Sequence, residues 1–496
     1  MLYICITIIK INVNMTRLID ALQTENTFTE NGMTTNSSSL NHCVDLFFQI
    51  GAMRGKKSTD VISLFSKAYG ENPLTALRLA FWVRDVKLGA GERQIFRDII
   101  YYLALNHSET LSKNLALISE FGRWDDILTL IGTSLEANAL DIIATALKNG
   151  NQLIAKWLPR PNVKNNVKKN QARVIRKYLD LTPGDYRRLL SGLSNTVEQS
   201  MCAKEFSNID YSKIPSKAMA DYLKAFGKND YDRFSAYITS LEKGETKVNA
   251  SAVYPYDIIK SLNASGNHKL PNEQWKALPN YLEGNKELLL PVCDVSGSMS
   301  CSAGSNKNLT CMDVCISLGM YISERNLGPF KDAFLTFHES PSLEVLNGSL
   351  SDRYNQLRRA KWGGSTNLEA TFKLVLDKAI ANNVSQEDMP TMILILSDME
   401  FNQAVSNFRS GNWNPTAQKM IEKMYSDSGY KMPKIAFWNL NARSGNSPVA
   451  FDKEGTALVS GFSTSILKSL LSGKDMTPES MMMDVVNSER YSSITV

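Results

Sequence analysis

Two hydrophobic patterns divide the chain into a helical part and a mixed part. From about Asn41 to Leu262, apolar residues recur three and four positions apart, which is the spacing that predicts amphipathic helices. The helical stretches are short, and a few polar residues or glycines separate them; they cover about 60–69, 73–85, 92–105, 111–121, 124–132 and 135–149. Consecutive short helices joined by short turns are typical of helical-repeat arrays, although no fixed repeat period is evident here.

Beyond Glu287, apolar strands alternate with helical stretches. The predicted strands are residues 288–294, 333–338, 342–346, 391–398, 434–439 and 456–460, and the predicted helices are about 310–325, 366–382, 413–427 and 462–472. This alternation is typical of a doubly wound, Rossmann-like sheet. Only three residues separate the second strand from the third, so these two should form a hairpin and give an otherwise parallel sheet one antiparallel edge. The predicted fold class is therefore an α part followed by an α/β part.

We expect five segments along the chain. Residues 1–38 are predicted to be a disordered tail, because residues 13 to about 38 are polar. For the apolar residues 1–12, the alternative is that they lie upstream of the true start at Met15. Residues 39–265 should form the helical-repeat domain, 266–286 a polar connector and 287–475 the sheet domain. Residues 476–496 should form a last helix that packs back on the body, with Thr477 as its cap and Pro478 at its first position.

Three loops of the sheet domain carry oxygen atoms that could bind a metal ion. Asp294, Ser296 and Ser298 form a D-x-S-x-S motif at the end of the first strand, Thr366 precedes a helix, and Asp398 ends a second buried strand. In open α/β sheets, ligands bind at the carboxyl ends of the strands. Carboxylate and hydroxyl oxygens suit a hard cation such as Mg²⁺ far better than zinc.

This set of residues resembles the metal-ion-dependent adhesion site of von Willebrand A domains, and all five ligand positions match. The resemblance implies that one Mg²⁺ or Mn²⁺ is held by Asp294, Ser296, Ser298, Thr366 and Asp398. It also implies that a carboxylate from a protein partner completes the coordination shell. The alternative is a von Willebrand A fold whose site is intact but idle.

The net charge of +5 is unevenly placed along the chain. Residues 151–190 contain ten basic and two acidic side chains, so this block carries +8 and the remainder carries −3. Such a block is the electrostatic footprint of a polyanion site, and Tyr178 and Tyr186 could add stacking surfaces for single-stranded bases. The candidate RNA-binding residues are Lys164, Lys168, Lys169, Arg173, Arg176, Lys177, Arg187 and Arg188. The alternative is a solvated helix face.

The helical part contains four further motifs: FWVRDVKLGAGER at 81–93, FGRWDD at 121–126, KWLPR at 156–160 and IPSKAM at 214–219. They resemble an uncharacterised family of plants, fungi and giant DNA viruses that joins a helical region to a C-terminal von Willebrand A domain. The architecture is also similar to the Ro autoantigen, whose TROVE domain is a ring of HEAT-like repeats closed by a von Willebrand A domain. That resemblance implies an N-terminal domain of HEAT-like repeats that binds RNA and that could close into a ring. We interpret the charged and aromatic motif residues as structural, holding adjacent helices in register: Arg84, Asp85, Arg93, Arg123, Trp124 and Asp126.

The functional prediction is a non-enzymatic, Ro-like RNA-binding protein with a Mg²⁺-dependent adhesion site. The alternative is a protein-interaction scaffold that docks a partner's carboxylate on the metal and binds no RNA. An enzyme is not expected, because no Ser-His-Asp or paired-acid arrangement stands out. No apolar run reaches membrane-spanning length, and seven cysteines without C-x-x-C spacing favour free thiols in a reducing cytoplasm. We expect a monomer that meets RNA, an acidic protein partner and no membrane.

Overall fold

The computed structural model describes residues 26–248, 250, 253–265, 269–303, 309–338, 340–359, 366–402, 416–443, 445–472 and 476–496. Contacts divide the chain into two compact units, here called the sheet unit and the helical unit. The sheet unit consists of residues up to Leu79, Tyr254–Lys260 and Asn280–Glu489; the helical unit consists of Ala80–Val253, Ser261–Pro279 and Arg490–Val496. Each unit therefore draws on both halves of the chain, unlike the continuous segments expected from the sequence.

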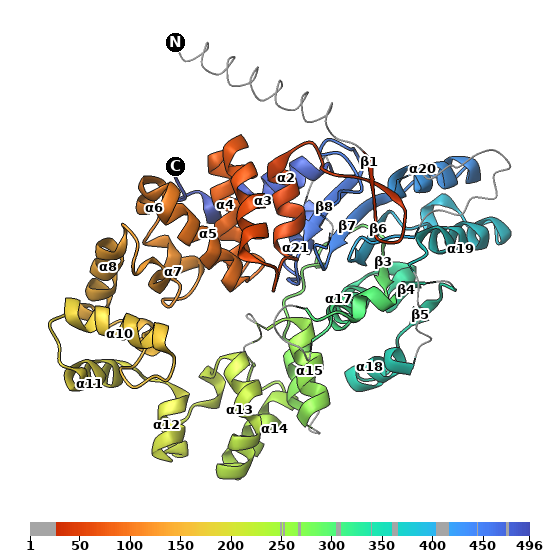
Figure 1. The fold of residues 1–496 in the computed structure, drawn as a ribbon. Coiled ribbons are helices and arrows are strands. Elements are labelled where there is room, and N and C mark those ends of the chain that lie inside the picture. Colours follow the sequence, from red (N-terminus) through yellow and green to blue (C-terminus); the bar gives the residue numbers. More distant parts are fainter. Residues whose placement is uncertain are drawn as a thin grey trace. The chain divides into compact units, whose positions relative to one another are not determined.

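The sheet unit is built on six strands in the order β5-β4-β3-β6-β7-β8 (Figure 1). They are β3 (Leu289–Asp294), β4 (Ala333–Phe337), β5 (Leu343–Val345), β6 (Met392–Ser397), β7 (Lys434–Asn439) and β8 (Thr456–Ser460). Neighbouring strands are parallel except β4 and β5, which form the expected antiparallel edge. Strands β3, β6 and β8 are buried along their whole length, which explains their nearly continuous apolar sequences. The predicted combination of a helical part with a mostly parallel sheet is confirmed.

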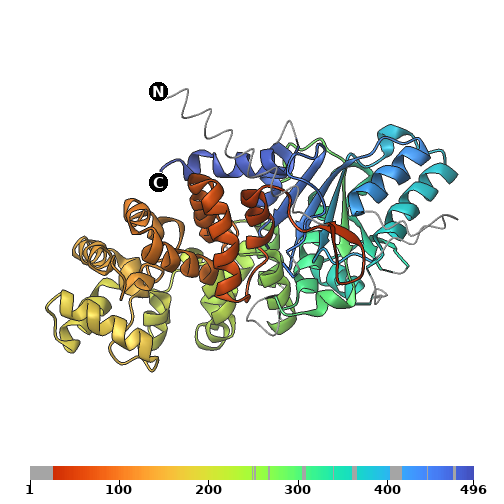
Figure 2. The same cartoon turned by 45° about the horizontal axis from the view of Figure 1, so that its top comes forward.

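Helices cover both faces of the sheet, and the order of the strands reverses at a switch point in the middle of the sheet. The sheet unit contains, wholly or in part, α2 (His42–Ile50), α3 (Ser58–Glu71), α4 (Pro73–Arg84), α15 (Pro255–Ser265), η4 (Gly297–Ser300), α17 (Cys311–Arg325), η5 (Gly328–Phe330), α18 (Leu350–Arg359), α19 (Leu368–Ala381), η6 (Gln386–Asp388), α20 (Ala417–Ser428), α21 (Ile466–Ser472) and α22 (Pro478–Val486). Helix α17 connects β3 to β4, whereas α20 connects β6 to β7 in the opposite direction across the sheet. Because parallel crossovers are right-handed, these helices cover opposite faces, and the strand order reverses between β3 and β6. Helices α19 and α20 pack side by side (Figures 1 and 2).

Helix α2 belongs to the sheet unit, although its sequence pattern continues into the helical part. It buries eight of its nine residues and packs against β8. The Ser460 hydroxyl donates to the Phe47 carbonyl at 2.6 Å and accepts from the Gly51 amide at 3.0 Å. The Asn439 side chain donates to the Phe48 carbonyl at 3.3 Å. The sequence correctly predicts a helix here, but its apolar face completes the core of the sheet unit.

Gly51 marks the closest approach between the end of α2 and β8. A Cβ atom at this position would lie 2.6 Å from the carbonyl oxygen of Ser460, which is a backbone atom. We expect Gly51→Ala to lower the free energy of unfolding by about 1–3 kcal/mol, because the helix must shift away from the strand. Gly70→Ala is the matched control: its Cβ would meet nothing within 4 Å, and alanine in a helix is favoured by up to about 1 kcal/mol. Urea unfolding measures both, and a Gly51→Ala protein as stable as the wild type would contradict this packing.

Residues 26–38 are not the disordered tail expected from the sequence. Two short strands pair here in antiparallel fashion, β1 (Asn26–Phe28) and β2 (Thr34–Asn36). Thr29 and Met33 are buried, and Asn36 pairs with the backbone of Ser447. The composition of this segment does not predict the hairpin, because the segment is polar and the residues that it pairs with, such as Ser447, are distant in the sequence. Residues 1–25, including the question of a start at Met15, lie outside the described residues.

The helical unit consists of short helices whose packing largely follows their order in the chain. They are α5 (Arg93–Asn106), α6 (Ser108–Lys113), α7 (Leu117–Phe121), η1 (Ile127–Leu130), α8 (Glu136–Lys148), α9 (Gln152–Trp157), α10 (Asn166–Tyr178), α11 (Pro183–Leu193), α12 (Val197–Ala203), η2 (Phe206–Asn208), η3 (Tyr211–Lys213), α13 (Ser216–Asn229), α14 (Tyr231–Glu242), α16 (Lys269–Lys276) and the last turn η7 (Glu489–Tyr491). Helix α5 packs on α6, α8 on α9, α9 on α11 and α13 on α14. Such pairing of near neighbours is what a helical array requires. Within the described ranges, no helix has the length and apolar character needed to cross a membrane.

Buried ion pairs stabilise the helical unit, as the structural interpretation of the sequence motifs predicts. Arg84 Nε donates to Asp126 Oδ2 at 2.7 Å, and both side chains are almost fully buried. Asp85 accepts hydrogen bonds from Arg490 at 2.7 and 2.9 Å and from the Tyr491 hydroxyl at 3.1 Å. The segment at Arg490 and Tyr491 is therefore anchored by charge in this unit, whereas the preceding helix α22 packs against β8 and α2 in the sheet unit.

Candidate metal centre

Four of the five predicted metal ligands follow the two strands at the switch point. Asp294 is the last residue of β3, and Asp398 directly follows β6. Ser296 and Ser298 lie in the loop after β3, where the chain forms one turn of 3-10 helix. Because β3 and β6 are adjacent and parallel, their carboxyl ends meet at one edge of the sheet. Motifs separated by about a hundred residues are thus brought together, since Ser397 and Asp294 are 103 positions apart.

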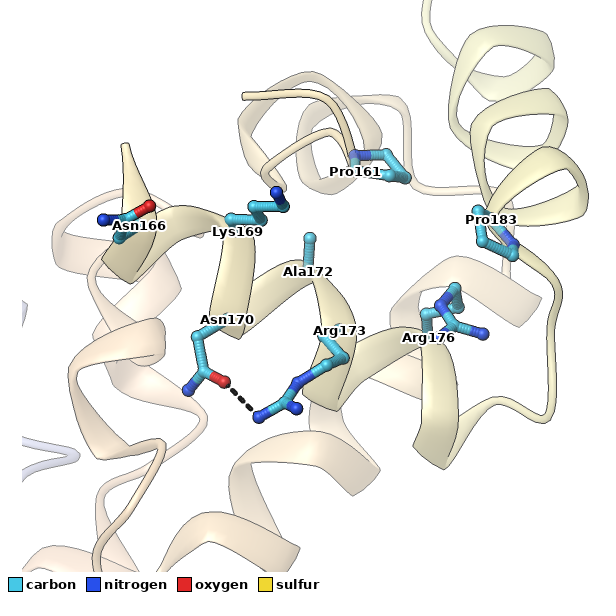
Figure 3. A pocket seen from close by; sticks show the side chains of 8 residues that line it. All are labelled: Pro161, Asn166, Lys169, Asn170, Ala172, Arg173, Arg176 and Pro183. Carbon is cyan, nitrogen blue, oxygen red and sulfur yellow. Dashed lines mark hydrogen bonds between the residues drawn. The ribbon is translucent and has the colours of Figure 1, made fainter. Parts of the chain in front are cut away.

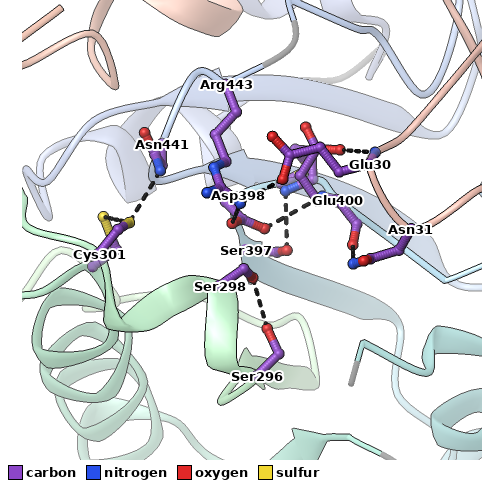
Figure 4. A network of polar contacts seen from close by, with 12 residues as sticks. Glu30, Asn31, Ser296, Ser298, Cys301, Ser397, Asp398, Glu400, Asn441 and Arg443 are labelled. Carbon is purple, nitrogen blue, oxygen red and sulfur yellow. Dashed lines mark hydrogen bonds and ion pairs between the residues drawn. The ribbon is translucent and has the colours of Figure 1, made fainter. Parts of the chain in front are cut away.

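Hydrogen bonds join these residues into one cluster. The Ser296 amide donates to Asp294 Oδ1 at 2.9 Å. The hydroxyl oxygens of Ser296 and Ser298 lie 2.9 Å apart (Figure 4). Ser298 also hydrogen-bonds to Asp398. The hydroxyl of Ser397 donates to Asp294 Oδ2 at 2.6 Å. Ser397 was not predicted as a site residue, although its position beside Asp398 at the end of a buried strand is a signal that could have identified it.

Thr366 joins the same edge through its backbone. Its amide donates to Asn402 Oδ1 at 3.2 Å, and its carbonyl accepts from the Asn402 amide at 2.9 Å. Asn402 lies in the loop that follows Asp398, so Thr366 is tied to the end of β6. The Thr366 side chain is buried, and its Oγ1 has no hydrogen-bond partner among the described residues.

The two carboxylates of the cluster are shielded from water. Asp294 is 0% exposed and Asp398 is 1% exposed. Burial raises the pKa of Asp294, and burial together with the nearby Asp294 charge raises the pKa of Asp398 to about 7. Asp398 Oδ2 accepts no hydrogen bond within the described structure, and Arg443 Nη1 lies 3.6 Å from it. A further cation at this edge would offset the mutual repulsion of the acids.

The donor set fits Mg²⁺ or Mn²⁺. Two carboxylates and three hydroxyls offer only hard oxygen atoms. Two of these atoms, Thr366 Oγ1 and Asp398 Oδ2, are buried without a hydrogen bond among the described residues, so both are free to bind a cation. In the described part of the chain, no group of three or more His, Cys, Asp or Glu side chains could hold a metal ion. A site at this edge therefore depends on its hydroxyl ligands.

The hairpin β1–β2 supplies neighbours of the site that the sequence did not reveal. Arg443 Nη1 contacts Glu30 Oε2 at 2.8 Å and so bridges Glu30 and Asp398. The Glu30 amide donates to the buried Glu400 carboxylate, and the Asn31 side chain donates to the Glu400 carbonyl, each at 2.6 Å (Figure 4). No motif marks Glu30, because it lies in a polar segment 413 residues away from Arg443.

The acid pair predicts a pH dependence of stability. The folded-state pKa of Asp398 is about 7, above the value of about 3.9 in an unfolded chain. Between these values the folded protein holds a proton that the unfolded chain has lost. The stability due to this proton is present below about pH 4 and is lost as the pH rises to about 7, with a slope of at most about 1.4 kcal/mol per pH unit. Thermal unfolding in EDTA should show a larger loss between pH 5 and pH 8 for the wild type than for Asp398→Asn; equal losses would contradict the pKa.

The candidate RNA-binding residues lie on α10, on α11 and just before α10. Arg176 is half-buried, and the others are exposed: Lys164, Lys168, Lys169, Arg173, Lys177, Arg187 and Arg188. Three of the cations line an open cleft of about 390 Å³, whose walls are Pro161, Asn166, Lys169, Asn170, Ala172, Arg173, Arg176 and Pro183 (Figure 3). This lining includes no acidic side chain. The cleft is thus electropositive and open to a ligand.

Some residues of the basic block have structural contacts. Arg176 Nη1 donates to the Leu181 carbonyl at 2.8 Å and so holds the turn between α10 and α11. Arg188 forms an ion pair with Asp185. Tyr186 is 0% exposed, so the prediction that it offers a stacking surface is wrong, whereas Tyr178 is 44% exposed. Tyr186 lies four residues before the buried Leu190 in α11, and this helical spacing is the signal that could have placed it in the core.

Two family models match the chain. A model described as a domain of unknown function, DUF2828, matches residues 29–153 and 143–288, which together make up more than half of the chain. The chain belongs to the DUF2828 family. A model described as a second domain of unknown function, DUF7788, matches residues 289–494 of this DUF2828 protein. The matches meet at the start of β3, close to Glu287, where the hydrophobic pattern of the sequence changes.

A relative from a giant virus covers nearly the whole DUF2828 chain. An uncharacterized protein of Acanthamoeba polyphaga mimivirus, L728, is 29% identical over 516 residues, which cover 92% of this chain and 87% of the viral protein. This agrees with the resemblance to a family that includes giant-virus members. Neither of the two matching models is a von Willebrand A or a TROVE model.

Proposed function

We propose that this protein is a non-enzymatic binding protein whose von Willebrand A-like sheet unit holds one Mg²⁺ or Mn²⁺ and uses it to bind an acidic group of a protein partner. The observation that supports this most strongly is the cluster that the buried Asp294 and Asp398 form with the Ser296 and Ser298 hydroxyls at the switch point of the sheet. Thr366 Oγ1 and Asp398 Oδ2 at the same edge lack hydrogen bonds among the described residues. A metal ion would supply the partner that the buried Thr366 Oγ1 lacks, and it would add to the contact of Asp398 Oδ2 with Arg443 at 3.6 Å. Both atoms lie at the edge of the sheet where the strands have their carboxyl ends, which is where α/β sheets bind ligands.

The five residues would share the work of holding the ion. Asp294 and Asp398 supply negative charge, and the neutral oxygen donors are Ser296, Ser298 and Thr366. The Ser397 hydroxyl and the Ser296 amide each donate to one oxygen of Asp294, so they fix the orientation of its carboxylate. When bound, Mg²⁺ would supply a concentrated positive charge that attracts a carboxylate from a partner.

Titration of Mn²⁺ into the full-length protein tests the metal site. One equivalent should bind weakly, because only two protein carboxylates face the ion and water must complete its shell. A short acidic peptide should then bind in Mn²⁺ but not in EDTA. The absence of any Mn²⁺ binding at millimolar concentration would refute the proposal, whereas metal binding without peptide binding would restrict it to the metal.

RNA binding by the helical unit is the second candidate function, and the acid-free cleft on α10 favours it. Lys169 and Arg173 both line this cleft, and their charges suit phosphate oxygens; the Arg173 guanidinium is turned toward Asn170 and donates to its Oδ1 at 2.7 Å (Figure 3). The exposed Tyr178 at the end of the same helix offers an aromatic face to an unpaired base. On this proposal the helical unit is TROVE-like, with HEAT-like repeats, and the protein acts as a Ro-like ribonucleoprotein component.

Reversing two charges in the cleft should weaken RNA binding. We expect Lys169→Glu combined with Arg173→Glu to reduce the affinity for a structured RNA by about tenfold or more at low salt, because two phosphate contacts become repulsive. The matched control is Lys224→Glu with Lys228→Glu, which makes the same charge change on exposed positions of α13. Filter binding over a salt series should show a shallower salt dependence for the cleft variant alone. Equal affinities for all three proteins would favour the solvated helix face.

A protein-interaction scaffold without RNA remains the alternative to this second function. It predicts that the purified protein carries no nucleic acid, as judged by the ratio of absorbance at the nucleic-acid and protein maxima. It also predicts that both double variants retain Mn²⁺-dependent binding of an acidic peptide. Co-purified RNA that is lost only from the cleft variant would instead support the Ro-like function.

A further inference from the structure

Cys301 and Cys311 lie opposite each other in the sheet unit. An antiparallel bridge pairs Ser302 with Thr310, so the next residues outward, Cys301 and Cys311, are also in register. The Cys311 amide donates to the Cys301 carbonyl at 3.0 Å, and the two sulfur atoms are 3.6 Å apart. Directly opposed residues of an antiparallel pair have Cα atoms about 4.5–5.5 Å apart. This separation falls within the range of about 4.4–6.8 Å that a disulfide bond spans.

The loop after β7 holds both sulfur atoms in place. The side-chain amide of Asn441 donates to Cys301 Sγ at 3.2 Å (Figure 4). The Cys311 thiol donates to the Leu440 carbonyl at 3.7 Å. Cys301 is half-buried, so a small oxidant has access to it, whereas Cys311 is only 1% exposed at the start of α17. The two thiols therefore differ in accessibility while their sulfur atoms are in contact.

We propose that Cys301 and Cys311 form a reversible disulfide when the protein meets a peroxide oxidant. The Cys301 thiolate attacks one oxygen of hydrogen peroxide, so an S–O bond forms, the O–O bond breaks and hydroxide leaves. The Cys311 sulfur then attacks the Cys301 sulfur, so an S–S bond forms and the S–O bond breaks; the leaving hydroxide takes the proton from Cys311 and becomes water. Two electrons pass from the sulfur atoms to the peroxide, and a thiol reductant reverses the reaction.

Other cysteines of the chain provide internal comparisons. Cys293 and Cys315 are also in contact with each other, but both are fully buried in the core of the sheet unit. A peroxide in solution should leave this second pair as thiols. Cys202 is exposed in the helical unit, so it reports whether the oxidant has reacted with the protein at all. Cys293 and Cys315 thus test the effect of proximity alone, and Cys202 tests the effect of accessibility alone.

Peptide mapping of the full-length protein tests the proposal. The protein is treated with hydrogen peroxide, its remaining thiols are alkylated and it is digested with trypsin, which can cut at Lys307 between the two cysteines. The two linked peptides also contain Cys293 and Cys315, so fragmentation of the linked peptides in the mass spectrometer must locate the bond. We expect it between Cys301 and Cys311, and we expect it to be lost after dithiothreitol. Thiol titration should show that Cys202→Ser still loses two thiols to this bond, and that Cys301→Ser forms no linked pair.

Two results would overturn the proposal. One is that Cys301 and Cys311 both remain open to alkylation in denaturant after a treatment that oxidises Cys202. The other is a linked pair that joins different cysteines. Because the mapping of the wild-type protein needs no substitution, a Cys311→Ser variant that fails to fold would not affect the outcome.

Discussion

Asp294→Ala should abolish Mn²⁺ binding and leave the sheet unit folded. Asp294 contributes one of only two carboxylates at the switch point, and its two oxygen atoms are fixed by the Ser296 amide and the Ser397 hydroxyl. Alanine removes this charge and leaves the Ser397 hydroxyl without its acceptor, which costs about 1–3 kcal/mol. The loss of the buried carboxylate also removes its repulsion with Asp398, so a large part of that cost is offset. Isothermal titration of Mn²⁺ measures the binding, and circular dichroism measures the fold.

The control for this variant is Asp377→Ala. Asp377 is an exposed carboxylate on α19 in the same unit, so its removal changes the net charge equally and should leave Mn²⁺ affinity within about twofold. Asp398→Asn provides a second test if Asp294→Ala proves unstable, because asparagine keeps the shape of the side chain. Unchanged Mn²⁺ affinity in both folded ligand variants would refute the metal site.

A fragment of residues 36–265 should be insoluble when it is made alone. It contains α2 but not β8, so the side chains of Val44, Leu46, Phe47, Phe48 and Ile50, which are at most 1% exposed in the full chain, would face water. Burial of a large apolar side chain contributes about 1.5–3 kcal/mol, so several such side chains on one helix form a strongly aggregating surface. We expect precipitation, or large oligomers in light scattering with increased binding of a hydrophobic dye.

Co-expression with residues 266–496 is the control for the fragment. The second fragment restores β8 as the partner of α2, so the two pieces should purify together in soluble form. A soluble monomer of residues 36–265 that unfolds cooperatively on its own would show that α2 does not need the sheet. It would also support the continuous domains that were expected from the sequence.

Local patterns in the sequence predicted most of the sheet unit. The strands β3 and β6 are recognisable because they are buried on both faces and therefore apolar along their length. The short spacing between β4 and β5 predicted the antiparallel edge of the sheet. The apolar strand before Asp294 placed its motif at a strand end. These features depend on residues close together in the chain, where hydrophobic spacing and turn length carry the information.

The features that the sequence did not predict depend on distant partners. Helix α2 looks like any amphipathic helix, and nothing in its own pattern names β8 as its partner. Glu30 and Arg443 meet only because the hairpin β1–β2 lies beside the end of β6. The basic block was recognised from its charge, but charge alone did not show that Arg176 holds a turn. Such outcomes are set by tertiary packing, which composition and periodicity do not report.

Asp85 is synthesised early, whereas its counter-charge is synthesised much later. Arg490 follows it after 405 residues, and at roughly 5–20 residues per second translation separates the two by about 20–80 s. Until then the helical unit must either leave Asp85 in water or bury a carboxylate without its cation, which costs several kcal/mol. A chain that stops before residue 490 never receives this cation. The stability of the helical unit therefore depends on a cation that translation supplies long after its carboxylate.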